Sequence, residues 1–246
     1  MPNHINRTGE KRITKQGYPI EVIECFKSTN CTVIFEDGLI IKKVDYSAIK
    51  NGTLKNPLHR SLCGVGFIGI GKYEASRNSK PYSIWRGVIT RGYDKKVKEK
   101  YPTYKEVTVC KEWHNFQNFA SWLEENYKEG FELDKDILIK RNKVYSPETC
   151  TFVPRYINTL FIKCNSKRGN LPIGVCYSTR DKVFVASVRI YGKSLHLGTF
   201  GTPEEAFQAY KTVKEEHIKE VAELYKDCIS ENTYNALIRY IIEKND

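Results

Sequence analysis

The pattern of hydrophobic and polar positions in the first sixty residues predicts short β-strands. Runs rich in β-branched and aromatic side chains occupy residues 21–26, 31–35 and 39–44, and such runs are typical of strands. Turn-forming Ser, Asn, Asp and Gly residues separate the runs at the short spacing of hairpins. We therefore expect residues 1–60 to form a small β-rich module with the topology of an antiparallel meander.

Beyond residue 60 the spacing becomes helical. Apolar residues recur on one face of a predicted helix at 82–91, and an aromatic stripe lines a second at 111–126. We interpret that stripe as packed core. The run 63–71 fits the dinucleotide pattern GxGxxG, but a polar segment ending in Pro81 follows it, where a dinucleotide fold requires a helix. We expect this run to be a glycine-rich strand or a linker.

Residues 131–160 combine strands with a short helix. A strand is predicted at 131–140, a second short strand at 144–145, and a helix at 155–160. A tight turn joins the two strands. The order strand, turn, strand and helix is a ββα layout.

The clearest alternation lies in the C-terminal third. Three strands are predicted at 173–177, 183–190 and 194–200, joined by short turns. A helix follows the third strand and is expected to cover one face of the sheet. The alternation along the second strand then places Arg189 and Ser187 on the face that stays open.

Local signals predict the helix that covers this sheet. Thr202 is the N-cap and forms a capping box with Glu205, and Pro203 fits the first helical position. The residues expected to pack on the sheet are Ala206, Phe207, Tyr210, Val213 and His217. A last helix, at 231–244, has an apolar stripe. We expect it to dock on the body of the protein, and a homodimer contact through it is the alternative.

These elements predict an α+β fold of several domains. The expected domains are a β-rich module at 1–60, a helical and ββα domain at 61–165, a sheet-and-helix domain at 166–228 and a terminal helix at 229–246. Hydrophobic residues make up 40% of the chain, which agrees with a globular core.

The net charge of the chain indicates a class of binding partner. The 246 residues include 40 Lys and Arg against 29 Asp and Glu, and the net charge is therefore +11. Nucleic acid is the commonest partner of such a surplus. Without an apolar run of membrane-spanning length or a secretory signal, we expect no membrane partner and a cytoplasmic location. The eight cysteines form no CxxC pair, so we expect thiols that pack as small hydrophobes, and no structural zinc.

The middle third resembles the metal-dependent HNH nucleases, in the branch found in phages and homing endonucleases. The resemblance rests on residues 82–85, 109–119, 133–136, 145–150 and Asn158. It implies that Asp134 and Asn158 hold one divalent ion, usually Mg²⁺, against the scissile phosphate.

The family's general base is replaced in this chain. Lys135 stands where the family has a histidine that activates water. A lysine is protonated at pH 7 and cannot accept the proton of water, although it could contact phosphate. Asp136 is a substitute base, but strand alternation points it to the opposite face. Two hypotheses stay open: a degenerate nuclease-like scaffold, and an active Mg²⁺-dependent endonuclease.

The C-terminal third resembles the ethylene-response-factor (apetala-type) DNA-binding domain, which occurs in plants and in phage endonucleases. The resemblance rests on residues 174–175, 184–189, 197–200, 202–206 and 209–210. It implies double-stranded DNA as the partner, because a three-stranded sheet fits the major groove. The expected DNA contacts are Arg180, Lys182, Arg189, Lys193, Lys167 and Arg168. The chain departs from the family at Cys176, where arginine is usual, and at Phe184, where tryptophan is usual.

Together these features predict sequence-directed binding of double-stranded DNA by a phage-type protein in the host cytoplasm. The nuclease centre is either degenerate or active. The third alternative is a phage interaction protein that acts on a host protein or a ribonucleoprotein.

Overall fold

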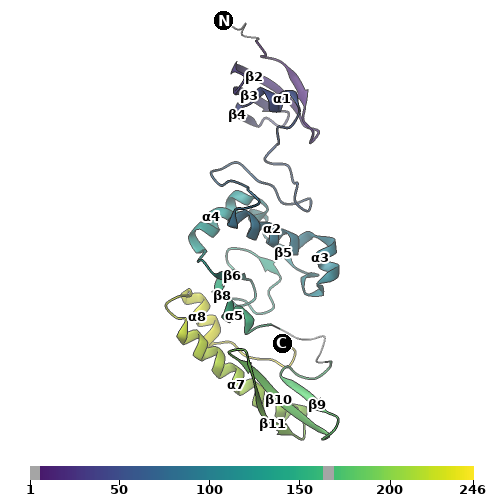
Figure 1. Ribbon diagram of the computed structural model, residues 1–246, viewed down its shortest axis with the longest axis vertical. Helices are drawn as coiled ribbons and strands as arrows, with labels where there is room; N and C mark the ends of the chain where they lie inside the picture. The colour runs from purple at the N-terminus through teal and green to yellow at the C-terminus, as the bar shows by residue number, and fades with distance from the viewer. Residues whose placement is uncertain (1–5, 163–168) are drawn as a thin grey trace. The chain divides into compact units, whose positions relative to one another are not determined.

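The computed structural model describes residues 6–162 and 169–246 and has an α+β fold (Figure 1), which confirms the predicted fold class. The chain divides into two compact units. The first unit comprises residues 1–93 and 111–120, and the second comprises residues 94–110 and 121–246. No helix in these described ranges combines the length and the apolar composition that a membrane crossing requires.

A four-stranded antiparallel sheet forms the N-terminal part of the first unit. Its strands, in spatial order, are β1 (Lys11–Ile13), β2 (Pro19–Lys27), β3 (Asn30–Phe35) and β4 (Ile40–Val44). The predicted meander is therefore present. Two further elements, β1 and the helix α1 (Tyr46–Lys50), were not predicted, because runs of three and five residues are too short to show a hydrophobic period.

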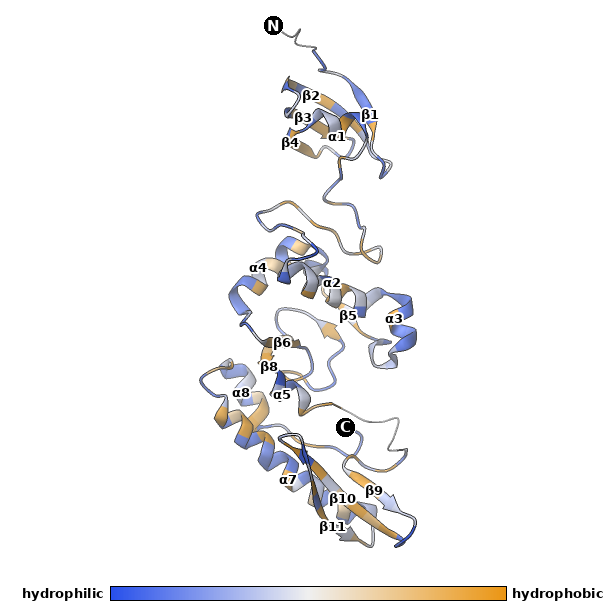
Figure 2. Ribbon diagram, in the orientation of Figure 1, coloured by the Kyte–Doolittle hydropathy of each residue, from blue (hydrophilic) through white to orange (hydrophobic). Residues whose placement is uncertain are grey.

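Alternating residues of this sheet form its core, and Figure 2 shows the alternation along β2. Val22 and Val33 are fully buried. Cys25 and Cys31 are directly opposite in the β2–β3 register and form a disulfide. The expectation that every cysteine is a free thiol is thus wrong for this pair, because strand register cannot be read from cysteine spacing alone.

Aromatic side chains from two predicted helical segments pack within the first unit. The predicted helix at 82–91 is confirmed as α2 (Lys80–Tyr93). The helix expected at 111–126 is divided into the 3-10 helix η2 (Lys111–His114) and α4 (Phe116–Asn126). Indole Nε1 of Trp85 donates a hydrogen bond to the backbone oxygen of Trp113, 2.7 Å away, and both side chains are buried. The aromatic stripe is core, as predicted.

The glycine-rich run 63–71 forms loops with isolated bridges, and no helix begins after it until Lys80. Gly69 has a φ of +75°, and a Cβ there would lie 2.0 Å from Oδ1 of Asn115. Glycine is thus required by close packing of the loop.

The second unit begins with short elements. They are α3 (Lys95–Lys100), the 3-10 helix η1 (Pro102–Tyr104) and β5 (Thr108–Val109). The side chain of Asp94 caps α3 by accepting the backbone N–H of Val97. Strand β5 pairs in parallel with β7 (Val144–Tyr145).

The predicted ββα layout is present with a different strand pairing. Strand β6 (Phe131–Asp134) pairs antiparallel with β8 (Thr151–Pro154), and α5 (Arg155–Thr159) follows directly. The prediction that the first strand runs to residue 140 is wrong, because the chain bends after Asp134. The predicted partner strand is wrong as well: residues 144–145 form β7, which pairs with β5.

The C-terminal sheet and helix match their prediction. The sheet has the order β11-β10-β9 and consists of β9 (Val175–Ser178), β10 (Val183–Ile190) and β11 (Lys193–Phe200). It packs on α7 (Pro203–Leu224). Hydrophobic and hydrophilic residues recur along this helix in Figure 2.

Close contacts hold this helix in place. Both hydrogen bonds of the predicted Thr202–Glu205 capping box are formed. Gly174, which precedes β9, has a φ of +78°, and a Cβ there would lie 2.0 Å from the ring of Tyr210. The glycine therefore lets the chain cross closely over the helix.

The ββα element and the C-terminal sheet share one hydrophobic core. Val153 and Ile157 from the ββα element are completely buried in the same cluster as Ala186 and Ile218. The last helix, α8 (Glu231–Ile238), contributes the buried Leu237 to this core, which confirms that it docks on the body. It ends earlier than the predicted residue 244.

Candidate nucleic-acid interface

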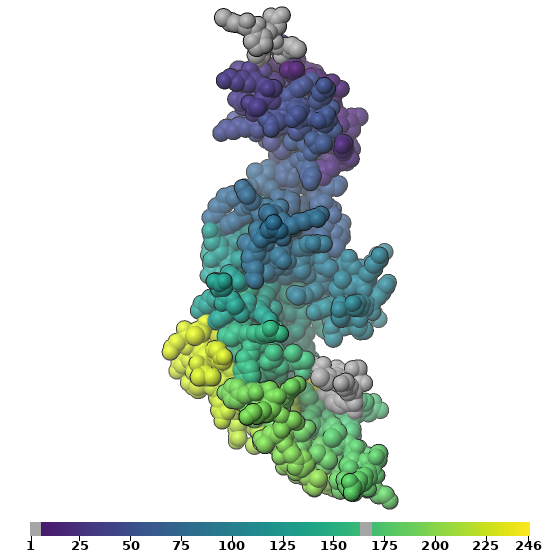
Figure 3. Space-filling view, viewed as in Figure 1, coloured from purple at the N-terminus to yellow at the C-terminus, as the bar shows by residue number. Residues whose placement is uncertain are grey.

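The strand register defines the face of the C-terminal sheet that α7 leaves open. Ala186 and Val188 are buried in the core beneath α7, so the intervening Ser187 and the exposed Arg189 lie on the opposite, open face. Directly paired residues share a face. The open face therefore consists of Cys176, Ser178, Val183, Val185, Ser187, Arg189, Ser194, His196 and Thr199. Green atoms of this sheet reach the molecular surface in Figure 3.

Four predicted DNA contacts lie on this face or at the hairpin ends beside it. Arg189 is on the face, Arg180 and Lys182 are in the turn between β9 and β10, and Lys193 begins β11. All four are exposed, and the Arg180 side chain is 94% exposed. None of the nine open-face residues of these described strands carries a carboxylate. Asp181, in the turn, accepts a hydrogen bond from the Ser178 hydroxyl at 2.9 Å and lies 3.9 Å from Arg180. Against this one carboxylate stand Arg180, Lys182, Arg189 and Lys193, so the face and its ends carry a net positive charge.

A β-bulge in β11 places residues on this face that sequence reasoning missed. Between the pairs Ala186–Gly198 and Ser187–His196 the register shifts and leaves Leu197 as an extra residue. His196 and Thr199 consequently share the open face, although regular alternation would separate them. The sequence signal for the bulge is Gly198, because glycine within a strand often marks such an irregularity.

The remaining predicted positions around this face have different outcomes. Cys176, where the resemblance leads one to expect an arginine, is an exposed thiol on the open face, opposite Val185. It offers no charge to a phosphate. Lys167 and Arg168 lie outside the described residues, so their predicted DNA contact remains a prediction.

Asp134, the predicted metal ligand of the ββα element, ends β6 and stabilises the bend after it. Its Oδ1 atom accepts the backbone N–H groups of Asp136 and Ile137, each at 2.7 Å. Burial raises the pKa of the Asp134 carboxyl above its ordinary value, and the two hydrogen bonds oppose this rise. This geometry is that of a turn-capping carboxylate.

Lys135 and Asp136, the two predicted catalytic residues, form an ion pair. Nζ of Lys135 lies 2.6 Å from Oδ2 of Asp136 and 2.9 Å from the backbone oxygen of Asn142. The opposite-face geometry expected of an extended strand is wrong here, because the bend turns both side chains together. Lys135 is only 8% exposed. A buried ammonium group with two acceptors is a structural cation, and Asp136 is its counter-ion.

Asn158, the second predicted metal ligand, is directed to a carboxylate that sequence reasoning did not single out. Its amide Nδ2 donates to Oε2 of Glu132, 2.7 Å away, and Nε of Arg155 lies 3.8 Å from Oε1 of the same residue. Glu132 is on β6, and the other two residues are three apart on α5. Only the β6–β8–α5 packing brings them together.

These contacts use part of the polar capacity of the two predicted Mg²⁺ ligands. Oδ1 of Asp134 accepts two backbone N–H groups, and the amide nitrogen of Asn158 donates to Glu132. The oxygens left to a Mg²⁺ ion, which binds through one or two carboxylates and keeps several waters, would be Oδ2 of Asp134 and Oδ1 of Asn158, and the predicted metal site stays a prediction. Within the described ranges, no three His, Cys, Asp or Glu side chains are grouped so that they could hold a metal ion. Burial also raises the pKa of the nearby Cys150 thiol to about 12, which keeps it protonated and unreactive at neutral pH.

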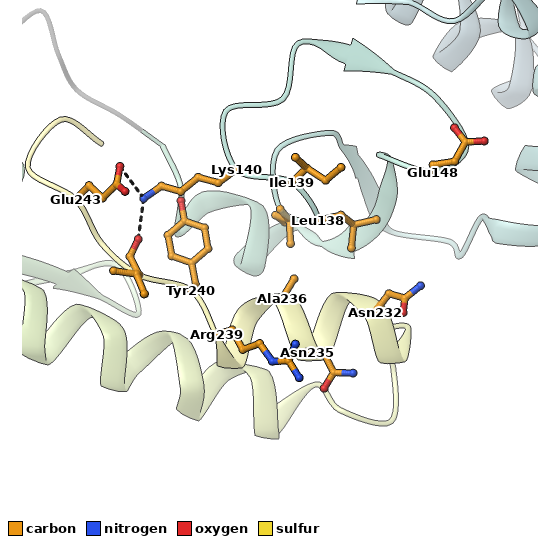
Figure 4. Close-up of a pocket in the computed structure, with 12 residues that line it drawn as sticks. Leu138, Ile139, Lys140, Glu148, Asn232, Asn235, Ala236, Arg239, Tyr240 and Glu243 are labelled. Carbon is orange, nitrogen blue, oxygen red and sulfur yellow. Dashed lines mark hydrogen bonds and ion pairs between the residues drawn. The ribbon is translucent and has the colours of Figure 1, made fainter.

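A cavity of about 700 Å³ lies between residues 137–140 and helix α8 (Figure 4). Lys140 on its wall binds the backbone oxygen of Ile241 at 2.7 Å and the Glu243 carboxylate at 3.5 Å. The described lining residues include no histidine, cysteine, serine or threonine. The described lining therefore offers no Ser or Thr hydroxyl, thiol or imidazole, and its titratable side chains are Lys140, Glu148, Arg239, Tyr240 and Glu243.

Comparisons with known proteins add no family. No protein-family model, no curated protein and no solved structure matches this chain. Its function must be argued from the geometry described above.

Proposed function

We propose that this protein binds double-stranded DNA through the open face of the β9–β11 sheet. One observation carries the proposal: a sheet face without carboxylates bears Arg189 and has exposed Arg180, Lys182 and Lys193 at its hairpin ends. Arginine on such a face can pair with guanine in the major groove, and lysine at its ends can contact phosphates.

The chemistry of the face favours duplex over single-stranded nucleic acid. Proteins that bind single strands without sequence preference stack bases on aromatic side chains. Apart from Arg189 and His196, the open face carries small, hydroxyl-bearing or aliphatic residues, with no Tyr, Phe or Trp among its nine positions. The same composition argues against a protein-docking surface, whose centre is usually enriched in aromatic residues.

We propose further that the ββα element acts as a scaffold beside this face and does not cleave DNA. Its predicted catalytic pair, Lys135 and Asp136, is satisfied internally, and Asp134 caps a turn. A nicking assay with supercoiled plasmid in Mg²⁺ or Mn²⁺ tests this part. Cleavage by the wild-type protein that is lost in Asp134→Ala would show instead that the protein is an endonuclease.

Fluorescence anisotropy with labelled duplex DNA tests the binding proposal. Arg189→Ala should weaken binding by about 1–3 kcal/mol, the usual contribution of a base-contacting arginine. The matched control is Lys219→Ala, which removes one positive charge from an exposed position on α7. If the two variants lose the same affinity for DNA, the binding depends on net charge alone. If Arg189→Ala binds DNA with full affinity, the open face is not the DNA-binding surface.

Cysteine protection offers a second, independent test. Cys176 is on the open face, and Cys228 is an exposed thiol outside the sheet. Bound duplex DNA should slow alkylation of Cys176 and leave Cys228 unchanged, as read from the two peptides by mass spectrometry. Protection of neither thiol at saturating DNA would contradict the proposed face. If this protein binds a host protein and has no affinity for DNA, only the hypothesis of an interaction protein remains.

A further inference from the structure

A single phenol oxygen connects three separate segments of the second unit. Oη of Tyr156, on α5, lies 2.7 Å from Nε2 of His217, on α7. The backbone N–H of Tyr191, in the turn between β10 and β11, donates to the same oxygen at 3.0 Å. His217 is 1% exposed, and its Nδ1 lies 3.3 Å from a carboxylate oxygen of Glu220. Helix α5, helix α7 and the hairpin turn therefore meet at Tyr156.

The turn at this point has a conformation that its residue disfavours. Tyr191 has a φ of +46°, in the left-handed region where Gly and Asn are usual and a bulky side chain is strained. Its ring stacks on Tyr156, with centroids 5.0 Å apart and an interplanar angle of 9°. It also makes a T-shaped contact with the His217 ring, with centroids 5.1 Å apart. These contacts, together with the hydrogen bond, offset the strain.

The same turn holds two of the residues placed at the proposed DNA interface. Nε of Arg189 donates to the backbone oxygen of Gly192 at 3.1 Å, and Lys193 follows directly. Ile190 and Lys193 are paired across the hairpin and close the turn. A change in the backbone at Tyr191 therefore moves the residues that flank it on both strands.

We propose that Tyr156 and His217 are positioning residues for the DNA-binding hairpin. The inference rests on the proposed function of the open face. Tyr156 holds the Tyr191 backbone in its left-handed conformation, and His217 fixes the Tyr156 hydroxyl group. The ββα element thus contributes to DNA binding through α5, as a brace for the turn that carries Arg189 and Lys193.

Hydrogen exchange and anisotropy on the full chain test this inference together. Tyr156→Phe keeps the stacked ring and removes only the oxygen. It should accelerate exchange of the Tyr191 amide at least tenfold and weaken duplex binding about three- to tenfold. Tyr177→Phe is the matched control, because it deletes the same phenol oxygen from an exposed tyrosine of β9, in the sheet that contains the hairpin. It should change neither quantity.

A rescue variant separates positioning from general stability. Asn adopts the left-handed conformation more readily than Tyr, so Tyr191→Asn added to Tyr156→Phe should restore affinity without the brace. Unchanged exchange at residue 191 in Tyr156→Phe, or accelerated exchange throughout the core, would overturn the inference. Failure of the double variant to regain affinity would overturn it as well. If the wild-type protein does not bind duplex DNA, the proposed function fails, whatever the exchange shows.

Discussion

The C-terminal sheet and the ββα element carry similar side chains and use them in opposite ways. In the sheet, Arg180 and Arg189 extend into solvent with at most a loose contact or one backbone acceptor. In the ββα element, Lys135 is buried between Asp136 and a backbone oxygen. The sheet residues are available to a ligand, whereas the ββα residues stabilise their own fold.

The difference shows what a motif in a sequence leaves open. A lysine between two aspartates suggests chemistry, but its role depends on whether its hydrogen-bonding capacity is already used. Buried polar groups are nearly always satisfied internally. A candidate site gains weight when its polar atoms are exposed and unsatisfied, and in this molecule that criterion selects the sheet.

Loss of Lys135 should have the largest effect on stability. Lys135→Ala removes a buried side chain and leaves the backbone oxygen of Asn142 without its partner, whereas the Asp136 side chain is 48% exposed and can be solvated by water. We expect the free energy of unfolding to fall by about 2–3 kcal/mol. Urea unfolding measures it, with Lys143→Ala as the exposed control. If Lys135→Ala folds but has no affinity for DNA, Lys135 takes part in binding, and the contrast between a ligand-binding sheet and a structural ββα element is wrong.

Lys214, on α7, extends the comparison to a buried lysine with no ion pair to another described residue. Burial lowers the pKa of Lys214 to about 8, so the charged form is disfavoured in the folded protein. Lys214→Met should raise the free energy of unfolding at pH 7 by about 1–3 kcal/mol.

The pH dependence of that effect has a defined sign. Between pH 8 and its ordinary pKa of 10.5, Lys214 holds more proton in the unfolded state, so wild-type stability should rise with pH across this window. The Met variant should lack that rise. A lower stability of Lys214→Met at pH 7 would contradict a cost of burying the charge.

A pair of Asp134 variants separates turn capping from metal binding. Asp134→Ala loses two hydrogen bonds and should lower the free energy of unfolding by about 1–2 kcal/mol, whereas Asp134→Asn keeps an acceptor oxygen and should change it by less than about 1 kcal/mol. Because burial raises the pKa of Asp134, wild-type stability should fall as pH rises from its ordinary value of 3.8 to the raised value. Thermal unfolding against pH should show this slope, and its persistence in Asp134→Asn would contradict the assignment.

Arg180 should show the smallest effect, on binding alone. Arg180→Ala should weaken duplex binding by about 0.5–1 kcal/mol and reduce the slope of log Kd against log salt by about one, as expected for a single phosphate contact. A titration at several salt concentrations measures both quantities. An unchanged slope would exclude Arg180 from the contact with the phosphates.

Local signals in the sequence predicted local structure well. The Thr202–Glu205 capping box and α7 follow from neighbouring residues, and their prediction holds. The wrong predictions concern non-local pairing. The partner of β6 is β8, from which residues 135–150 separate it, because tertiary packing outweighed the nearer hairpin. The Cys25–Cys31 bond depends on strand register in the same way.

The candidate sites follow the same division. Alternation along β10 placed Arg189 correctly, but the bulge at Leu197 hid His196 and Thr199. The Lys135–Asp136 contact depends on the bend after β6. The sequence did not show this bend, because the apolar run at 137–139 resembles the continuation of a strand. Chemistry within one regular element could thus be predicted, whereas contacts created by bends and bulges could not.

The hydrophobic core that Val153 and Ile157 share with the C-terminal sheet makes the two elements one folding unit. A fragment cut at the predicted boundary before residue 166 would lose these buried partners, because the cut separates two halves of one core. If the sheet binds DNA as proposed, it can be transplanted in folded form into another protein only together with the ββα element.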